Sequence, residues 1–294
     1  PDRTPEEQKE REASADRFEP TDEPDAQVGG EVRVAEWAVE MLEAHREEPF
    51  FIGAGFSKPH VPLIAPRRFF ELYDGADMQP PVRDPEAEAK LPAQALRPNF
   101  DIFIRREAKD EAEVRRAMRA YYACISFMDA QVGKILYAVD RLELWEHTVV
   151  VLMSDHGFHL GEYGLWSKMT LFDPSTRVPF ILAAPGIADP GKPTVRLSEH
   201  VDLYPTLAEL CGLPVPEGLE GTSLAPLLAD PERAWKSAVF SQVRRGQGMG
   251  RMARSERWTY HRWEDSGGEE LYDMETDPHQ LKNLSDDPGT ASAL

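Results

Sequence analysis

An apolar run that stops at polar residues is the most informative pattern in this chain. Residues 148 to 153 carry no charge and are rich in valine, and Ser154, Asp155, His156 and Gly157 follow directly. A continuous apolar run is typical of a strand covered on both faces, as in the parallel sheet of an α/β protein. Because sites in such sheets collect at the carboxyl ends of strands, we predict that this strand delivers Asp155 and His156 to a site. An aspartate that caps a helix, beside a solvated histidine, is the alternative.

A glycine-containing loop follows this strand. Gly161 and Gly164 disfavour an ordinary helix over residues 158 to 166, and the loop then reaches Lys168. Lys168 is close enough in sequence to Asp155 to return to the same strand end. We therefore expect a carboxylate, an imidazole and an ammonium group to share one pocket.

A second apolar segment ends in a similar way. Residues 50 to 56 predict a short buried strand, and Lys58 and His60 follow it in a Ser-Lys-Pro-His sequence. A histidine with a pKa near the working pH can donate a proton to a leaving oxygen. The alternative for His60 is an incidental histidine on a surface turn, and Lys58 either contacts an anionic group or is solvated. We predict that the two strand ends converge.

Periodicity predicts most of the remaining elements. Apolar residues recur at helical spacing over residues 31–46 and 110–141, which indicates two amphipathic helices. Residues 1–26 are acidic and almost free of large apolar side chains, which indicates a solvated segment. Further elements are expected as a strand at 178–186, a helix at 198–210, and strands at 238–242 and 252–263.

Composition and charge exclude several classes of protein. The 294 residues have a net charge of −19, which argues against binding to a nucleic-acid backbone. No stretch approaches the run of about eighteen apolar residues that a membrane span needs, so none is predicted. Cys124 and Cys211 are too few for a disulfide framework, and we expect both to be buried structural residues. For His200 and Asp202 we expect capping and packing roles.

Several short motifs together resemble the sulfatase family in order and in spacing. They comprise Ser154-Asp155-His156-Gly157, Leu160-Gly161-Glu162, Trp166-Ser167-Lys168, Phe172-Asp173 and Arg177-Val178-Pro179. The Lys-Pro-His loop at residues 58–60 and the tail at residues 270–284 match as well. The motifs are similar to those of the iduronate-2-sulfatase-like group, and the resemblance runs from about Gly30 onward.

The resemblance implies a fold and a domain organisation. The fold is the α/β fold of the alkaline phosphatase superfamily, with a central, mostly parallel sheet flanked by helices. A small antiparallel α+β subdomain is expected at the C-terminus. The implied division is an acidic extended segment at residues 1–26, the α/β domain at 27–230 and the C-terminal subdomain at 231–294.

The resemblance also implies roles for the residues at the two strand ends. Asp155 and His156 match ligands of a divalent cation, Ca²⁺ in this family. Lys168 and His60 match catalytic residues that contact the sulfate group, and Lys58 matches a further substrate-binding residue. Their local positive charge would attract an anionic substrate to an otherwise acidic protein.

The family's nucleophile has no counterpart in these residues. It is a formylglycine made from the first residue of a Cys/Ser-x-Pro-x-Arg motif, and neither Cys124 nor Cys211 lies in such a motif. We therefore expect the chain to be about the C-terminal two-thirds of a sulfatase, with the formylglycine upstream, and to be inactive in isolation. Tyr163 replaces the histidine of the family's Gly-Glu-His-Gly segment, a change that could alter contacts around the site or the substrate preference.

The function implied by the resemblance is hydrolysis of a sulfate ester on a sulfated sugar or glycosaminoglycan. One alternative is a phosphodiesterase or phosphonate monoester hydrolase of the same superfamily. Another is a non-catalytic glycan-binding or interaction protein. The implied partners are a sulfated carbohydrate and a missing N-terminal segment of the same protein, and the implied location is periplasmic or secreted.

Overall fold

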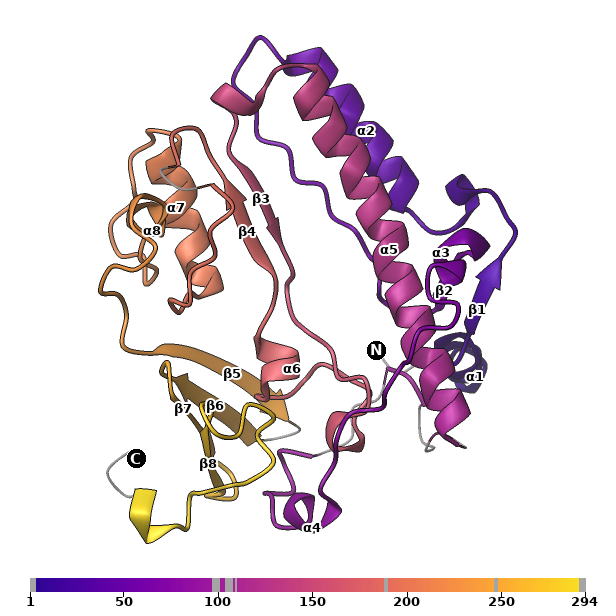
Figure 1. The fold of residues 1–294 in the computed structure, drawn as a ribbon, viewed down its shortest axis with the longest axis vertical. Helices are drawn as coiled ribbons and strands as arrows, with labels where there is room; N and C mark the ends of the chain where they lie inside the picture. The colour runs from indigo at the N-terminus through magenta and orange to yellow at the C-terminus, as the bar shows by residue number, and fades with distance from the viewer. Residues whose placement is uncertain are drawn as a thin grey trace. The chain divides into compact units, whose positions relative to one another are not determined.

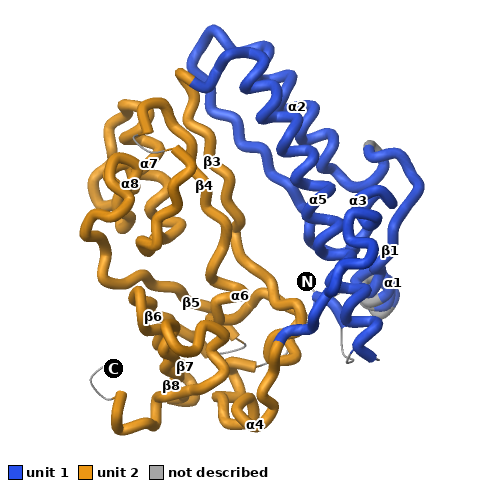
Figure 2. The backbone as a smooth tube through the Cα atoms, viewed as in Figure 1, with its two compact units in different colours: residues 1–81, 100–145 blue, residues 82–99, 146–294 orange. Residues whose placement is uncertain are grey.

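The computed structural model describes residues 4–96, 101–103, 108, 110–187, 190–245 and 248–290. The chain forms two compact units, both with helices and strands. Unit 1 contains residues 1–81 and 100–145, and unit 2 contains residues 82–99 and 146–294 (Figure 2). The domain boundaries expected near residues 26 and 230 are a different division and stay a prediction.

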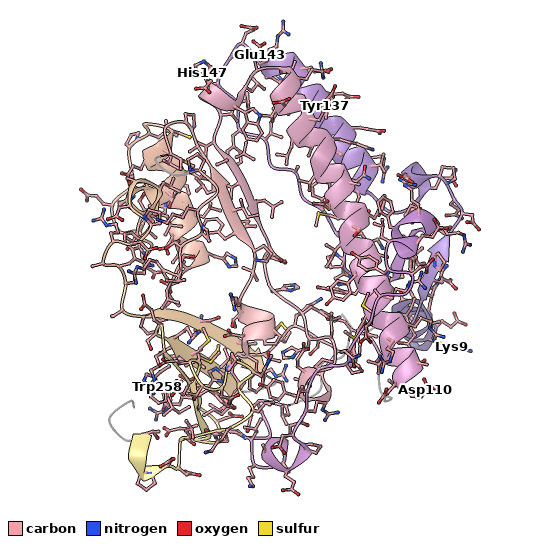
Figure 3. All side chains as sticks on the ribbon, viewed as in Figure 1. Lys9, Asp110, Tyr137, Glu143, His147 and Trp258 are labelled. Atoms are coloured by element: carbon pink, nitrogen blue, oxygen red, sulfur yellow. The ribbon has the colours of Figure 1, made fainter. Side chains whose placement is uncertain are left out.

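Two helices form the main packing layer of unit 1 (Figure 1). They are α2 (Glu31–His45) and α5 (Glu111–Arg141), and both predicted amphipathic helices are thus confirmed. Asp110 caps α5, because its carboxylate accepts a hydrogen bond from the N–H of Glu113 at 2.8 Å. Figure 3 shows Asp110 and Tyr137 near opposite ends of this helix. The buried cluster that joins the two helices consists of Leu42, Ala138, Val139 and Leu144.

The acidic N-terminal segment contains a helix, which corrects the expected extended segment. Helix α1 (Pro5–Ala15) begins with a reciprocal cap, in which the Thr4 hydroxyl accepts from the N–H of Glu7 and the Glu7 carboxylate accepts from the N–H of Thr4. The high charge of this segment predicts that it is solvated, but its glutamate, lysine and alanine residues are also strong helix formers, and they favour α1. Unit 1 also contains β1 (Phe18–Thr21), η1 (Asp25–Gln27), β2 (Leu63–Pro66) and α3 (Arg67–Glu71). Strands β1 and β2 pair in parallel.

The strand predicted over residues 50–56 does not form. Phe51 is 87 % exposed, whereas Phe50 and Ile52 pack against the cluster between α2 and α5. A strand needs a hydrogen-bonded neighbour, and within the described ranges no strand pairs with this segment. Alternate side chains of the segment still pack inward, but its backbone makes no strand-to-strand hydrogen bonds within the described ranges.

The strand predicted before Asp155 is confirmed, although its surroundings differ from the expectation. In unit 2, β3 (Val150–Met153) pairs with β4 (Phe180–Ala183), which is also a predicted strand. The pair is antiparallel, with Met153 opposite Phe180. Strand β3 is half-buried rather than fully buried, and its partner is not parallel, so the apolar run overstated how completely the strand is covered.

A four-stranded antiparallel sheet forms the C-terminal part of unit 2, as predicted. Its strands run in the order β5-β6-β7-β8, and every neighbouring pair is antiparallel. One face packs on a core built partly from the loop after β3. The strands are β5 (Val239–Arg245), β6 (Gly248–Arg254), β7 (Trp258–Trp263) and β8 (Glu269–Asp273). The buried core residues include Tyr163, Leu171, Phe172, Val243, Met252, Trp263 and Tyr272.

The helices of unit 2 are short, and α7 confirms the helix predicted over residues 198–210. They are α4 (Pro85–Glu88), η3 (Glu162–Gly164), α6 (Asp173–Thr176), η4 (His200–Asp202), α7 (Leu203–Leu210), α8 (Ala225–Ala229) and η5 (Pro288–Thr290). Across the described parts of both units, no helix combines the length and apolar character needed to cross a membrane.

The two cysteines differ in environment. Cys124 is buried in α5, as predicted, and burial raises the pKa of its thiol to about 12. Cys211 directly follows α7 and is exposed, so the buried role expected for it is wrong. The reason is its place at the end of the helix, where the chain turns away from the buried helix face.

Candidate functional site

Hydrogen bonds from three directions hold the backbone corner at the end of β3. The N–H of Ser154 donates to the carbonyl of Pro179 at 3.3 Å. The carbonyl of Ser154 lies 3.0 Å from Nε2 of His200. The Ser154 hydroxyl donates to the carbonyl of His156 at 2.7 Å. The path of the chain on either side of Asp155 is therefore well defined.

The turn that contains His200 also contains a buried carboxylate, that of Asp202. Asp202 is fully buried and accepts from the N–H groups of Glu199 and Thr222, both at 2.8 Å. Nζ of Lys236 donates to both Asp202 oxygens and to Glu199. Burial alone would lower the pKa of Lys236, but the hydrogen bonds to Asp202 and Glu199 raise it. The structural role predicted for Asp202 is confirmed.

Asp155 and His156 together present groups suited to a cation. Their side chains are 85 % and 41 % exposed. Oδ1 of Asp155 accepts from the N–H of His156 at 3.0 Å, and Nδ1 of His156 lies 2.9 Å from the carbonyl of Gly157. The carbonyl can only accept, so Nδ1 carries a proton, and Nε2 is the ring nitrogen that could bind a metal, as is usual for metal-binding histidines.

This pair fits a cation, but it is a partial ligand set. Asp155 supplies a hard oxygen and His156 a ring nitrogen, with 3.5 Å between Nε2 and Oδ2 of the aspartate. Calcium takes about six to eight oxygen ligands, so further groups are required. Within the described ranges, no cluster of three or more histidine, cysteine, aspartate or glutamate side chains is arranged to hold a metal.

Gly157 allows the loop after this corner to approach α6 closely. Its N–H donates to the carbonyl of Ser175 at 2.8 Å. A Cβ atom at this position would lie 2.1 Å from the carbonyl oxygen of Pro174, far inside contact distance. The glycine is therefore required by packing, and its backbone lies directly on α6.

The loop that carries Lys168 has a polar network at its base. His159 is fully buried, and its Nε2 lies 2.8 Å from the hydroxyl of Thr170, which donates to Ser175. The hydroxyl proton of Thr170 points to Ser175, so Nε2 of His159 is the donor in the first contact. Burial, together with the charge of Arg245, lowers the pKa of His159 to about 3 and keeps the ring neutral. Lys168 itself is half-buried.

Tyr163 also belongs to this loop. It adopts a left-handed conformation, with φ at 56°, between Gly161 and Gly164. Its ring is buried, and its hydroxyl donates to the carbonyls of His279 and Gln280 at 2.7 and 3.1 Å. The side chain that replaces the family's histidine therefore binds the C-terminal tail.

The corner with Lys58 and His60 lies in unit 1. Glu31, which is buried, accepts from the N–H groups of Ser57 and Lys58 at 3.2 and 3.0 Å. Nζ of Lys58 donates to the carbonyl of Pro62 at 2.7 Å, which leaves the ammonium two further donors. The ring of His60 is exposed, with Nδ1 3.0 Å from the carbonyl of Val61.

The predicted site residues thus form two groups. Asp155, His156 and Lys168 belong to unit 2, whereas Lys58 and His60 belong to unit 1. That Asp155, His156 and Lys168 share one pocket stays a prediction. That the two groups meet around one anion stays a prediction.

Two family models match the chain. The model described as Sulfatase matches residues 12–213, and the model described as N-sulphoglucosamine sulphohydrolase, C-terminal, matches residues 161–293. Both matches include the loop with Lys168, and the first also includes Lys58, His60, Asp155 and His156.

Similar proteins include sulfatases from distant organisms. The choline-sulfatase of Rhizobium meliloti (strain 1021) is 34 % identical over 251 residues, which is 82 % of this chain and 47 % of that protein. The iduronate 2-sulfatase of Homo sapiens is 34 % identical over 220 residues, 62 % of this chain and 40 % of that protein. The chain spans about half the length of the curated relatives it matches.

The fold has counterparts among solved structures. A phosphonate monoester hydrolase from Silicibacter pomeroyi superposes with a TM-score of 0.83 at 22 % identity, over 95 % of this chain and 63 % of the other. At this identity the likeness concerns the fold alone. It confirms the α/β fold that the motifs implied.

Proposed function

The chain belongs to the sulfatase family, and we therefore propose that it serves in the hydrolysis of a sulfate ester carried by a sugar. The observation that carries the proposal is the corner at residues 154–157, where hydrogen bonds hold the backbone that carries the exposed side chains of Asp155 and His156. The name of the human relative supports a sulfated uronic acid as the substrate class. The family also supports an exported setting, periplasmic or secreted.

Charge stabilisation is the main requirement of the reaction. A sulfate ester in its transition state carries negative charge on its outer oxygens and on the leaving oxygen, and fixed positive groups lower that barrier. Asp155 and His156 would hold a divalent cation, for which we propose calcium, and that ion supplies Lewis-acid chemistry when bound. The fit rests on the exposed carboxylate of Asp155 and on Nε2 of His156, which lies 3.5 Å from Oδ2 of that carboxylate.

The remaining predicted residues act on the substrate directly. The ammonium of Lys168 would bind a sulfate oxygen as a point charge, and the Lys58 ammonium would contribute a second positive group. The exposed ring of His60 would donate its proton to the leaving oxygen, which avoids an unstable alkoxide. Neither Cys124 nor Cys211 lies in a motif that is converted to formylglycine.

An assay with matched variants tests the proposal. The complete reading frame that encodes these residues and the 294-residue chain alone are each expressed and supplied with an aryl sulfate and with a sulfated disaccharide. We expect turnover by the former and none by the latter. Lys168→Ala should lower kcat/KM by about 100-fold or more, as loss of a transition-state donor does. Lys90→Ala replaces an exposed lysine of the same unit and should change little.

The same assay separates the rival functions. Faster turnover of a phosphate diester or a phosphonate monoester than of any sulfate ester would favour the phosphonate-hydrolase chemistry of the structural neighbour. Binding of a sulfated glycan that survives both chelation and Lys168→Ala, with no turnover of any ester, would indicate a binding protein instead. Activity of the isolated chain would refute the expectation that its nucleophile lies elsewhere.

A further inference from the structure

A buried arginine of the C-terminal sheet reaches the loop that carries Lys168. Arg245 is the last residue of β5 and is 3 % exposed. Its Nη1 donates to the carbonyl of Met169, and its Nε donates to the carbonyl of Gln94 at 3.3 Å. All of these residues belong to unit 2. The guanidinium therefore links the sheet to the residue next to Lys168.

The backbone on both sides of Lys168 is fixed by a series of hydrogen bonds. The carbonyl of Ser167 accepts from the N–H of His159 at 2.8 Å, and the carbonyl of Lys168 accepts from the N–H of Thr170 at 3.0 Å. Arg245 serves the third carbonyl in this run, that of Met169. Two of these donors come from the loop itself, whereas Arg245 comes from a strand 76 residues further along the chain.

We propose that Arg245 is a positioning residue for Lys168. By holding the carbonyl of Met169, it fixes the peptide plane between Met169 and Thr170, one peptide beyond Lys168, and so restricts how the backbone that carries the lysine stem can turn. The inference rests on the proposed role of Lys168 as a sulfate-binding group, and it adds the residue through which the C-terminal sheet contributes to that role.

The chemistry of the arginine supports a positioning role. The buried guanidinium donates to the backbone carbonyls of Met169, Gln94 and Ala95. What arginine provides is a rigid planar fork that serves two chain segments at once, here at Met169 and Gln94.

The contact also explains why a short loop can hold a charged group in place. Lysine has a flexible stem, so the precision of its ammonium depends on the backbone from which it starts. A displacement of about 1 Å at a reacting group costs up to about 100-fold in rate. We therefore expect loss of the Arg245 contact to lower kcat more than it raises KM.

A double-mutant cycle in the complete protein tests the inference. Arg245→Met removes the donors at similar length, Lys168→Ala removes the group being positioned, and the double variant combines them. With an aryl sulfate we expect Arg245→Met to lower kcat/KM about 10- to 100-fold in the native background and less than about threefold in the Lys168→Ala background. Arg251→Met, an exposed arginine on the neighbouring strand, should stay within about twofold of the native protein.

A second readout does not depend on activity. Amide hydrogen exchange of residues 167–170 in the 294-residue chain should become at least about tenfold faster in Arg245→Met and remain unchanged in Arg251→Met. The inference would be overturned if Arg245→Met lowered kcat/KM by the same factor in the native and the Lys168→Ala backgrounds. It would also be overturned if Arg245→Met left the amide exchange of residues 167–170 unchanged. If native protein fails to cleave any sulfate ester, the proposed function fails, and exchange still decides whether Arg245 holds this loop. If Arg245→Met does not fold, Arg245→Lys, which keeps the charge but not the fork, is compared in the same two measurements.

Discussion

The ring of Tyr163 stacks on the ring of Phe172, with centroids 4.1 Å apart and planes at 18°. Its hydroxyl donates to the carbonyls of His279 and Gln280 in the C-terminal tail. The side chain of Gln280 in turn accepts from the N–H of Asp173 at 2.7 Å. Tyr163 and Gln280 thus tie the tail to both ends of the loop that carries Lys168.

Replacement of Tyr163 by phenylalanine should weaken this connection and leave the stack intact. The variant loses the hydroxyl that donates to the carbonyls of His279 and Gln280, and we expect the free energy of unfolding to fall by about 1–3 kcal/mol. Denaturant unfolding followed by fluorescence measures the change. Tyr137→Phe, at an exposed position on α5, is the control and should stay within about 0.5 kcal/mol (Figure 3). Equal stability of both variants would show that the tail contact contributes nothing.

Gly157→Ala should destabilise the corner beside Asp155. The added Cβ would meet the carbonyl oxygen of Pro174, which is backbone and cannot rotate away, so we expect a loss of about 1–3 kcal/mol. Gly133→Ala in α5 is the matched control, because nothing lies within 4 Å of its Cβ position. It should gain about 0.5–1 kcal/mol from helix propensity. Thermal unfolding of both variants tests the pair, and a neutral Gly157→Ala would mean that α6 can move.

Much of the fold follows from local sequence patterns, and the failures have a common cause. α2 and α5 were predictable because their apolar residues repeat at helical spacing. The apolar runs at residues 50–56 and in β3 predict fully buried strands, yet Phe51 is exposed and β3 is half-buried, because burial depends on which neighbours cover a segment. That information lies in distant segments and not in the apolar run itself.

The same distinction applies to the site. Asp155, His156 and Lys168 were found because each lies in a short motif next to a strand or a glycine loop. The contacts that support them could not be predicted: His200, for which a capping or packing role was expected, reaches Ser154 across 46 residues, and Arg245 reaches the carbonyl of Met169 across 76. No local spacing links such pairs. The contact between Tyr163 and the tail, across 116 residues, was missed for the same reason, although the departure from the family's histidine had marked the position.

Acidification should destabilise the protein through His159. The folded protein holds this ring neutral with a pKa of about 3, whereas an unfolded chain protonates it near pH 6.5. Between those values the unfolded state binds one more proton, so the free energy of unfolding falls as the pH falls. At pH 5 this single group should cost about 2 kcal/mol relative to pH 8.

Urea unfolding across this pH range, with a variant that cannot titrate, isolates the contribution of His159. His159→Gln keeps a donor for the hydroxyl of Thr170 but has no ionisable ring, so its stability should fall less steeply below pH 6.5. His147→Gln, at an exposed position, should follow the native curve. Parallel curves for native protein and His159→Gln would contradict a buried neutral imidazole.

A buried histidine–glutamate pair should dominate the stability of the C-terminal sheet. His261 and Glu270 are both fully buried on neighbouring strands, with 2.7 Å between Nδ1 and the carboxylate, which also accepts from the indole N–H of Trp263 at 3.1 Å. Glu270→Ala removes the acceptor of these two donors and of the Tyr272 hydroxyl at 3.4 Å, and we expect a loss of about 3–5 kcal/mol. Glu270→Gln keeps one carbonyl acceptor and should lose less. Glu275→Ala, at an exposed position in the turn after β8, should lose less than about 1 kcal/mol in the same unfolding experiment. A loss in Glu270→Ala no larger than in Glu275→Ala would mean that packing, and not this pair, holds the sheet together.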